Sequence, residues 1–422
     1  MGSLRFLPST VRARLALAGA LTILYILAST LYIRQYPSLE LQPQDLHQSP
    51  SPPANDTEPA PPEKPRILLV SSFFPVPNPQ FTDADYDKWL PFFLGANTND
   101  IYLFTTPELE KHLQVAPMRG ANMTITFDTS YASPLEIPPL KGKEELYRRI
   151  LKKDRAKTRR SVELYANRHA KPFFLQNAVS LLEKRGLTYQ FAFWVDAGSF
   201  RSKHVYRDWP SPSRLEEIWE EGSKASGTKS EDMIFVPVSR PPHKTMTFWT
   251  DNMGPIENDL SIASFFGGTP NALHWWTRAY YAYHDYYLSL EVFIGRNQAL
   301  INVLLFLFPE RFITVWYNDP DAPAHLALNR TLPEQSFLGQ CSSERSYYQF
   351  WLADDAERKA MQQVWIAKAS AWRWWGWWVP RDTTPCQTTR VLPVLSVLRS
   401  KLGDDWKAPT GQVNIPDTLS WD

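Results

Sequence analysis

Residues 15–33, LALAGALTILYILASTLYI, form a run of 19 residues without a charged side chain. A helix rises about 1.5 Å per residue, so this run is long enough to cross a bilayer. Arg5, Arg12 and Arg14 precede it, and no acidic residue lies among residues 1–14. Arginine excess on one side of a span places that side in the cytosol. We therefore expect a cytoplasmic tail at 1–14, a transmembrane signal anchor at 15–33 and a lumenal remainder.

A cleaved signal peptide is the alternative for this run. Its apolar region is usually about 7–15 residues long and ends at a small-x-small site. Here the run ends in Thr30-Leu31-Tyr32-Ile33, which suits cleavage poorly. The short span favours a thin internal membrane over a thick plasma membrane.

Residues 35–65 contain nine prolines. Proline fixes φ and keeps a chain extended, so residues 34–65 are expected to be a stem. The sequons at Asn55, Asn122 and Asn329 predict glycosylation in a secretory lumen.

The chain has only two cysteines, which excludes a disulfide scaffold and a four-thiolate zinc site. Cys341 and Cys386 lie 45 residues apart. In an oxidising lumen they are able to pair, and two free thiols are the alternative.

The chain has the composition of a globular protein, with 43% hydrophobic and 21% charged residues. The net charge of +1 excludes a strongly basic nucleic-acid binder. Short apolar runs alternate with helical segments, which predicts an α/β domain with a mainly parallel sheet. We place this domain at residues 66–380 and a C-terminal extension at 381–422. Strands are expected at 67–74, 101–106, 124–127, 191–195, 233–238 and 312–317, and helices at 107–115, 161–184 with a break at Pro172, 211–223, 270–290 and 295–308.

Two biased segments allow more than one interpretation. Residues 141–160 carry ten Lys or Arg and three acids, which fits either a phosphate-attracting face or a solvated basic helix. The Trp-rich run from Trp365 to Trp378 fits a core-packing element, a membrane-interface element or a sugar-stacking platform.

The strongest local pattern for a binding site is FWVDAGSFR, residues 193–201. An apolar strand delivers Asp196 at its carboxyl end, where ligands bind in open α/β sheets. A carboxylate there holds a divalent ion or accepts hydroxyl groups. Gly198 permits close backbone approach, and Arg201 is placed to meet a phosphate or to pair with Asp196. An Asp that only caps a turn is the alternative.

Two weaker patterns follow. Gly267 and Gly268 separate a strand from a helix, and their N–H groups are expected to face a ligand, unless they form a plain turn. The polar start of an apolar helix at Gly295-Arg296-Asn297-Gln298 predicts a site wall or an ordinary helix cap. The chain has no Walker A loop, no G-x-S-x-G elbow, no HExxH and no GxGxxG.

In this order, these patterns resemble the HtrL/YibB-like family, whose members are similar to glycosyltransferases with a GT-A-type nucleotide-sugar fold. The resemblance covers roughly residues 66–318 and is carried by a helix with Lys171-Pro172, W-x-D-A-G-x-x-R at Trp194–Arg201, F-F-G-G at Phe265–Gly268, and Gly295–Gln298. The chain departs from the family at Asn297, where an acid is usual. It also lacks the Asp-x-Asp metal motif of many GT-A enzymes, because residue 198 is Gly.

The resemblance implies a glycosyltransferase that moves a sugar from a nucleotide-sugar donor to a glycan, protein or lipid hydroxyl. Asp196 would contact the donor, directly or through Mn²⁺ or Mg²⁺, and Lys171 and Arg201 would stabilise the diphosphate. Gly267, Gly268 and Gln298 would bind substrate. Asp251, Glu257 and Asp259 are the candidate bases, with Asp259 preferred.

Anchor, stem and lumenal domain together match the layout of Golgi glycosyltransferases. We therefore expect a single-pass type II protein of the Golgi membrane, with the endoplasmic reticulum as the alternative and no nucleic-acid partner. Two other functions stay open: a non-catalytic, membrane-anchored glycan-binding or scaffold protein on a GT-A-like domain, and a lumenal hydrolase.

Overall fold

The computed structural model describes residues 66–77, 81–114, 124–326, 338–373, 384–419 and 421. The expected anchor at 15–33, the stem at 34–65 and the sequons at Asn55, Asn122 and Asn329 lie outside these residues. Within the described ranges, no helix has both the length and the apolar character that a bilayer span requires. The described residues belong to one compact unit, Pro62–Asp422.

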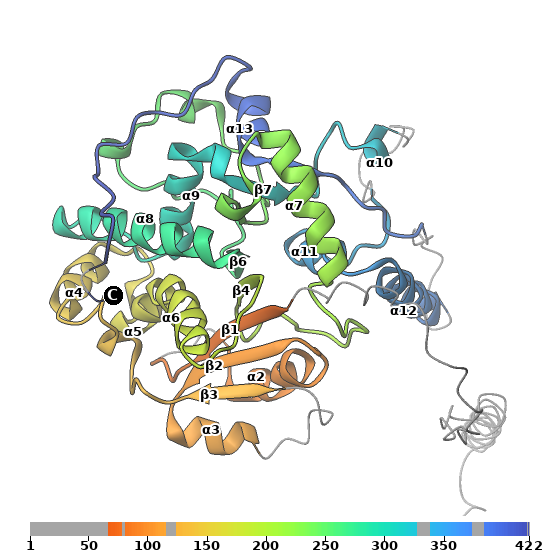
Figure 1. Cartoon of the computed structure of the whole chain (residues 1–422), viewed down its shortest axis with the longest axis horizontal. Coiled ribbons are helices and arrows are strands. Elements are labelled where there is room, and N and C mark those ends of the chain that lie inside the picture. Colours follow the sequence, from red (N-terminus) through yellow and green to blue (C-terminus); the bar gives the residue numbers. More distant parts are fainter. Residues whose placement is uncertain are drawn as a thin grey trace, which may run out of the picture. The chain divides into compact units, whose positions relative to one another are not determined.

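The core of this unit is one mixed sheet with the strand order β3-β2-β1-β4-β6-β5-β7-β8 (Figure 1). Its strands are β1 (Ile67–Phe73), β2 (Asp100–Thr105), β3 (Ile125–Asp128), β4 (Phe191–Val195), β5 (Ile234–Phe235), β6 (Phe265–Gly268), β7 (Phe312–Val315) and β8 (Val391–Pro393). β6 runs antiparallel to β4 and β5, and β8 runs antiparallel to β7. The other paired strands are parallel. The expectation of an α/β domain with a mainly parallel sheet is confirmed.

Both faces of the sheet are covered, which explains why β1 is apolar at every position of its first half. Leu68 and Val70 point into one hydrophobic cluster, while Ile67 and Leu69 point into the other. Successive side chains of a strand alternate between faces, so a strand between two helix layers needs apolar residues in both registers.

The helices form these two layers (Figure 1). Those packed on the face of Leu68 are α4 (Glu144–Lys153), α5 (Val162–His169), α6 (Lys171–Glu183), α8 (Pro270–Ser289), α9 (Asn297–Leu307) and α13 (Val394–Leu402). Those packed on the face of Leu69 are α2 (Asp83–Leu90), α3 (Pro107–Gln114), α7 (Pro212–Ser226), α11 (Tyr347–Trp351) and α12 (Asp355–Arg373). A short helix, α10 (Pro323–Leu326), completes the described elements.

The helix predicted at 161–184 is broken where proline indicated a break. Ser161 caps α5 by accepting a hydrogen bond from the backbone N–H of Leu164. α5 ends at His169, and Ala170 links it to α6. Pro172 lies in the first turn of α6, where a missing N–H costs no helix hydrogen bond. The break directs Lys171 towards the end of β4.

The C-terminal segment expected as an extension contributes to the same sheet. Its strand β8 pairs with β7, and Val394 of α13 is fully buried. Of the Trp-rich run, Trp365 packs on the ring of Phe350, with 5.4 Å between ring centroids. The other tryptophans of that run, Trp372 to Trp378, lie outside the residues whose side chains are described.

Candidate active site

The main cleft lies where the sheet changes its direction of winding. From β1 the chain builds β2 and β3 on one side, and β4 lies on the other side. Such a switch point leaves a crevice outside the carboxyl ends of the two central strands. A cleft of about 1430 Å³ occupies this position, lined by Phe73 and Phe74 at the end of β1 and by Asp196 to Gly198 at the end of β4.

Asp196 is held in place by two donors. Nζ of Lys171 and Nε1 of Trp194 each donate a hydrogen bond of 2.6 Å to its Oδ1. Lys171 also donates to the carbonyl oxygen of Ala263, at 3.2 Å. Burial lowers the pKa of Lys171, and the charge of Asp196 acts against that shift. Oδ2 of Asp196 accepts no hydrogen bond among the described residues, and the side chain is 37% exposed, so this oxygen is accessible to a ligand.

Arg201 lines the same cleft but does not pair with Asp196, one of the two roles expected for it. Its guanidinium stacks on two rings, 4.3 Å from the centroid of Phe81 and 4.7 Å from that of Trp89. Its Nε donates to the carbonyl oxygen of Gly198 at 3.1 Å. A Cβ at Gly198 would lie 3.3 Å from the ring of Trp89, so this glycine leaves room for the aromatic wall.

The start of α9 forms another wall, as its polar residues suggested. Arg296, Asn297 and Gln298 all line the cleft. Gln298 donates its side-chain N–H to the carbonyl oxygen of Ser261. Asn297 is 6% exposed, and its Nδ2 has no hydrogen-bond partner among the residues that the structure describes.

Gly267 and Gly268 do not form the ligand-facing turn that the sequence suggested. They are the last residues of β6, paired with β4 and β5, and they are absent from the cleft lining in the described structure. A Cβ at Gly267 would lie 2.2 Å from the carbonyl oxygen of Ala192, and one at Gly268 would lie 2.5 Å from that of Met233. Close strand packing therefore explains both glycines.

The three candidate bases, Asp251, Glu257 and Asp259, lie in different environments. Asp259 lines the cleft. Asp251 is fully buried elsewhere, where its Oδ2 accepts hydrogen bonds from the hydroxyl of Tyr283 and the backbone N–H of Gln412. Glu257 is not among the lining residues, although Arg296 is close enough to act on its pKa, which burial raises.

Four of the ten cations in the basic segment 141–160 form ion pairs with acids, and all four belong to α4 or directly precede it. Arg148 pairs with Glu144 and Glu145, and Arg149 pairs with Glu145 and Glu291. Within this segment only Arg160 lines the cleft in the described structure. The interpretation as a solvated basic helix therefore fits α4. Of this segment, Arg160 is the residue placed to attract a phosphate in the cleft.

Sequence reasoning missed several residues of the cleft. They are the aromatic wall of α2 (Tyr86, Trp89) with Phe81, the cations Arg168 and Arg345, and the serines 342, 343 and 346. The capping box of Thr82 and Asp85 marks the start of α2 and was available as a signal. Nothing local in the sequence marks the arginines.

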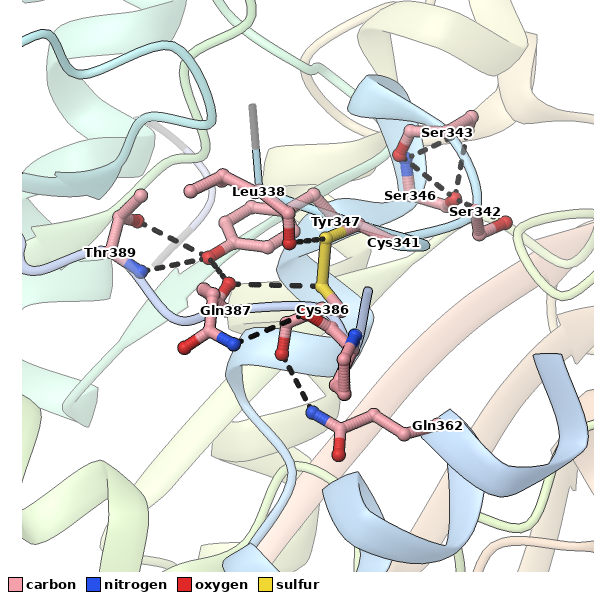
Figure 2. Close-up of a disulfide and its surroundings, with 11 residues drawn as sticks. Leu338, Cys341, Ser342, Ser343, Ser346, Tyr347, Gln362, Cys386, Gln387 and Thr389 are labelled. Atoms are coloured by element: carbon pink, nitrogen blue, oxygen red, sulfur yellow. Dashed lines mark hydrogen bonds between the residues drawn. A yellow bond between two sulfur atoms is a disulfide. The ribbon is translucent and has the colours of Figure 1, made fainter. Parts of the chain in front are cut away.

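A disulfide bond between Cys341 and Cys386 anchors the serine-rich wall (Figure 2). Ser342 and Ser343 follow the first cysteine directly, and Ser346 hydrogen-bonds back to Ser343. The next residue, Tyr347, donates its hydroxyl to the carbonyl oxygen of Gln387, beside the second cysteine. The bond therefore fixes the loop that carries these serines into the cleft.

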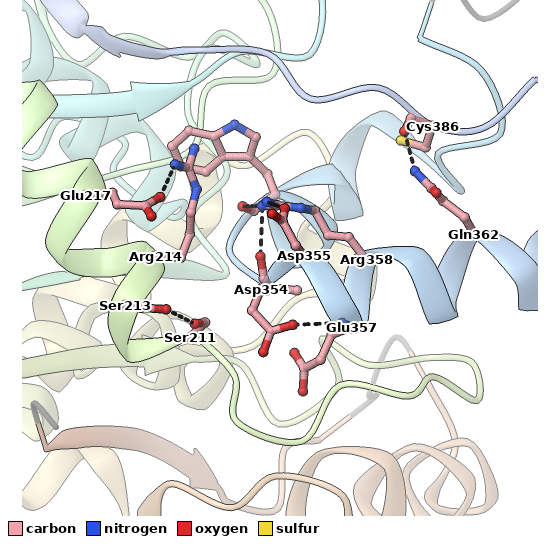
Figure 3. Close-up of polar contacts among 12 residues, drawn as sticks. Ser211, Ser213, Arg214, Glu217, Asp354, Asp355, Glu357, Arg358, Gln362 and Cys386 are labelled. Atoms are coloured by element: carbon pink, nitrogen blue, oxygen red, sulfur yellow. Dashed lines mark hydrogen bonds and ion pairs between the residues drawn. The ribbon is translucent and has the colours of Figure 1, made fainter.

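Side chains of α7 and α12 contact α11, and Figure 3 shows two of them, Arg214 and Arg358. The guanidinium of Arg214 lies 4.7 Å from the ring centroid of Trp351. Arg358 donates hydrogen bonds to the carbonyl oxygens of Trp351 and Ala353. From α11, the side-chain N–H of Gln349 donates to the carbonyl oxygen of Ser199 at 2.9 Å, which ties this support to the loop after β4.

Comparisons with known proteins give remote structural matches. No protein-family model and no curated protein sequence matches the chain. One similar solved structure is core-mannan synthase A from Aspergillus fumigatus in its Mn/GDP form, with 11% identity, a TM-score of 0.31, and 68% of this chain and 86% of that chain covered. Another is the galactosyltransferase LgtC in complex with donor and acceptor sugar analogs, with 12% identity, a TM-score of 0.32, and coverages of 72% and 95%.

Asp196 was expected to contact the donor either directly or through a divalent cation. In the described part of the chain, no group of three or more His, Cys, Asp or Glu side chains is placed to hold a metal. The one oxygen of Asp196 that has partners already faces the ammonium of Lys171. A divalent ion bound to this oxygen would be repelled by the ammonium, whose Nζ lies 2.6 Å from Oδ1.

Proposed function

We propose that this chain is a GT-A-type glycosyltransferase that transfers a sugar from a nucleotide-sugar donor to a hydroxyl of a glycan, protein or lipid. The observation that carries the proposal is the oriented carboxylate of Asp196 in the crevice at the switch point of the sheet. The resemblance of the sequence to the HtrL/YibB-like family, which rests partly on the same residues, agrees with it.

The size and lining of the cleft agree with two substrates. Sites for drug-sized ligands are usually about 300–1000 Å³. At about 1430 Å³ the cleft has room for a donor and for part of an acceptor. The lining combines aromatic faces, which pack on bases and sugar rings, with serines and carboxylates that hydrogen-bond to hydroxyl groups.

We assign the donor to the Asp196 side of the cleft. Oδ2 of Asp196 accepts from a hydroxyl of the ribose or of the transferred sugar, while Lys171 keeps the carboxylate ionised and oriented. Asp259, which also lines the cleft, is the proposed base for an acceptor hydroxyl. Gln298 and Arg201 line the same cleft.

We place this activity in the secretory pathway, on a type II anchor at residues 15–33 and in the Golgi membrane. The apolar run and the proline-rich stem motivate this location. The disulfide bond supports it, because such bonds persist in oxidising compartments.

A ligand screen tests the proposed function. The full-length chain is heated with a panel of nucleoside diphosphates and nucleotide sugars, and transfer to water or to sugar acceptors is measured for any nucleotide sugar that stabilises it. A ligand at 100 times its Kd should stabilise the fold by about 2.7 kcal/mol, which is readily measured. Asp196→Asn should remove most of the binding and at least about 90% of the turnover, because it removes a charge-assisted acceptor.

The matched control is Glu220→Gln, an acid on the exposed face of α7. It should leave binding and turnover unchanged. Binding of a nucleotide sugar without any turnover would instead support the non-catalytic protein, and cleavage of a glycan without a nucleotide sugar would support a hydrolase. A folded chain that binds no nucleotide would contradict the proposal.

A further inference from the structure

Positive charge dominates the lining of the cleft. Its cations are Arg160, Arg168, Lys171, Arg201, Arg296 and Arg345, and its acids are Asp83, Asp87, Asp196 and Asp259. Of these cations, only Lys171 forms an ion pair with a carboxylate among the described residues. Structural arginines usually find a carboxylate partner when one is near, so unpaired arginines in one cleft indicate an anionic ligand.

Three of the arginines converge on the start of α9. Arg168 is fixed there, because its Nη1 donates to the carbonyl oxygen of Gly295 at 2.9 Å. Arg296 is the next residue in the chain after Gly295. Burial first, and then the charges of Arg160 and Arg296, lower the pKa of Arg168 to about 10. The three charges therefore repel one another, and a bound anion would relieve that repulsion.

The N-terminus of α9 adds neutral donors at the same place. The helix has 11 residues, no side chain caps its first turn, and its N-terminal end carries a partial positive charge. Asn297 is buried in this turn and lines the cleft, and its Nδ2 lacks a partner in the described part of the chain. A buried amide donor without a partner costs stability unless a ligand oxygen accepts from it.

A divalent ion is not needed to balance a diphosphate here. The chain supplies three arginines and a helix N-terminus for two phosphate groups, while the charge of Lys171 is already balanced by Asp196. Arginine forks match phosphate oxygens in pairs, which gives both charge and geometry.

We propose that Arg160, Arg168, Arg296 and the N-terminus of α9 bind the diphosphate of the donor directly, without a divalent cation. This inference rests on the proposed function and names how its donor is held. The shared ligand chemistry is a diphosphate, free or within a nucleotide.

Calorimetric titration of the full-length chain with inorganic pyrophosphate in EDTA tests this site. Binding is expected in EDTA, and a nucleoside diphosphate in the same buffer is expected to bind more tightly, because the aromatic wall adds contacts. Arg168→Gln and Arg160→Gln should each weaken pyrophosphate about tenfold, the loss of one charge-assisted contact. The side chain of Arg160 makes no hydrogen bond within the described structure, so its substitution leaves the fold intact even if Arg168→Gln does not fold.

The matched control is Arg148→Gln on α4, which removes an equal charge outside the cleft. The affinity of this variant for pyrophosphate should stay within twofold of that of the parent chain. An equal loss in this control would show general electrostatic attraction and overturn the inference. Binding that appears only after Mn²⁺ or Mg²⁺ is added would also overturn it while leaving the proposed function in place. No binding of pyrophosphate or of any nucleoside diphosphate, with or without metal, would overturn both.

Discussion

At the scale of single residues, the hydrogen-bond partners of a side chain determine which of its atoms face a ligand. Asp196 is one carboxylate at the end of a strand, and alone it would rotate freely. Lys171 and Trp194 hold one of its oxygens from two sides, so the other oxygen has a defined direction. Such support is what makes a carboxylate at a strand end useful as a binding group.

His169 shows the opposite use of a titratable residue. It is fully buried, with Nε2 2.6 Å from the carbonyl oxygen of Ile294 and Nδ1 2.8 Å from the hydroxyl of Tyr280. Because a carbonyl only accepts, Nε2 carries a proton. Burial lowers the pKa of the ring well below the ordinary value of about 6.5, so the ring is neutral and its Nδ1 accepts from the tyrosine.

This histidine predicts a loss of stability on acidification. Below pH 6.5 the unfolded chain binds a proton at His169 that the folded chain does not, so the free energy of unfolding falls as the pH falls. Between pH 7 and pH 5 the contribution should approach about 1.4 kcal/mol per pH unit. Urea unfolding at pH 5, 6 and 7 measures it. His169→Gln should reduce the slope, and an unchanged slope in that variant would rule out His169 as its source.

At the scale of elements, strand β6 explains the Gly267-Gly268 pair, which the sequence suggested to be a ligand-facing turn. Its two glycines lie between β4 and β5, where neighbouring carbonyl oxygens leave no space for a side chain. A glycine pair before a helix is the same sequence signal as a ligand-binding turn. Only the pairing of the strand, which is set by distant residues, distinguishes the two.

Gly267→Ala should therefore destabilise the fold strongly. The new Cβ would lie 2.2 Å from the carbonyl oxygen of Ala192, so strands must move apart. We expect a loss of about 3 kcal/mol or more in the free energy of unfolding. Gly186→Ala is the control, since its φ of +79° is strained but nothing lies within 4 Å of the added Cβ. It should cost about 1 kcal/mol. Equal effects would show that backbone strain, and not strand spacing, governs Gly267.

The disulfide bond should stabilise both the fold and the serine-rich wall of the cleft. It closes a loop of 45 residues, which corresponds to about 4 kcal/mol of unfolded-state entropy. Reduction with dithiothreitol should lower the thermal midpoint and weaken any ligand of the cleft. Cys341→Ala with Cys386→Ala should show the lower midpoint without reductant and no further change with it. A midpoint insensitive to dithiothreitol in the parent chain would contradict this expectation.

For the molecule as a whole, the sequence was most informative where structure is local. The runs expected at 67–74, 101–106, 124–127 and 191–195 correspond to strands β1, β2, β3 and β4, and those expected at 233–238 and 312–317 correspond to β5 and β7. Strand β8 was missed because its pairing is non-local, and the two glycines of β6 were interpreted as a turn because their strand partners are distant in the sequence. The same reason hid the arginines of the cleft: Arg160, Arg168 and Arg296 converge only after the chain has folded.

The cleft also joins parts of the chain that are made at very different times. Its first lining residue, Ser72, belongs to β1, while Gln349 belongs to α11 near the other end of the domain. Contacts between such distant residues form late, because the intervening chain must be ordered first. During synthesis, the floor around Asp196 is complete long before the serine-rich wall emerges. Ligand binding in this cleft would therefore report that a newly made chain has finished folding.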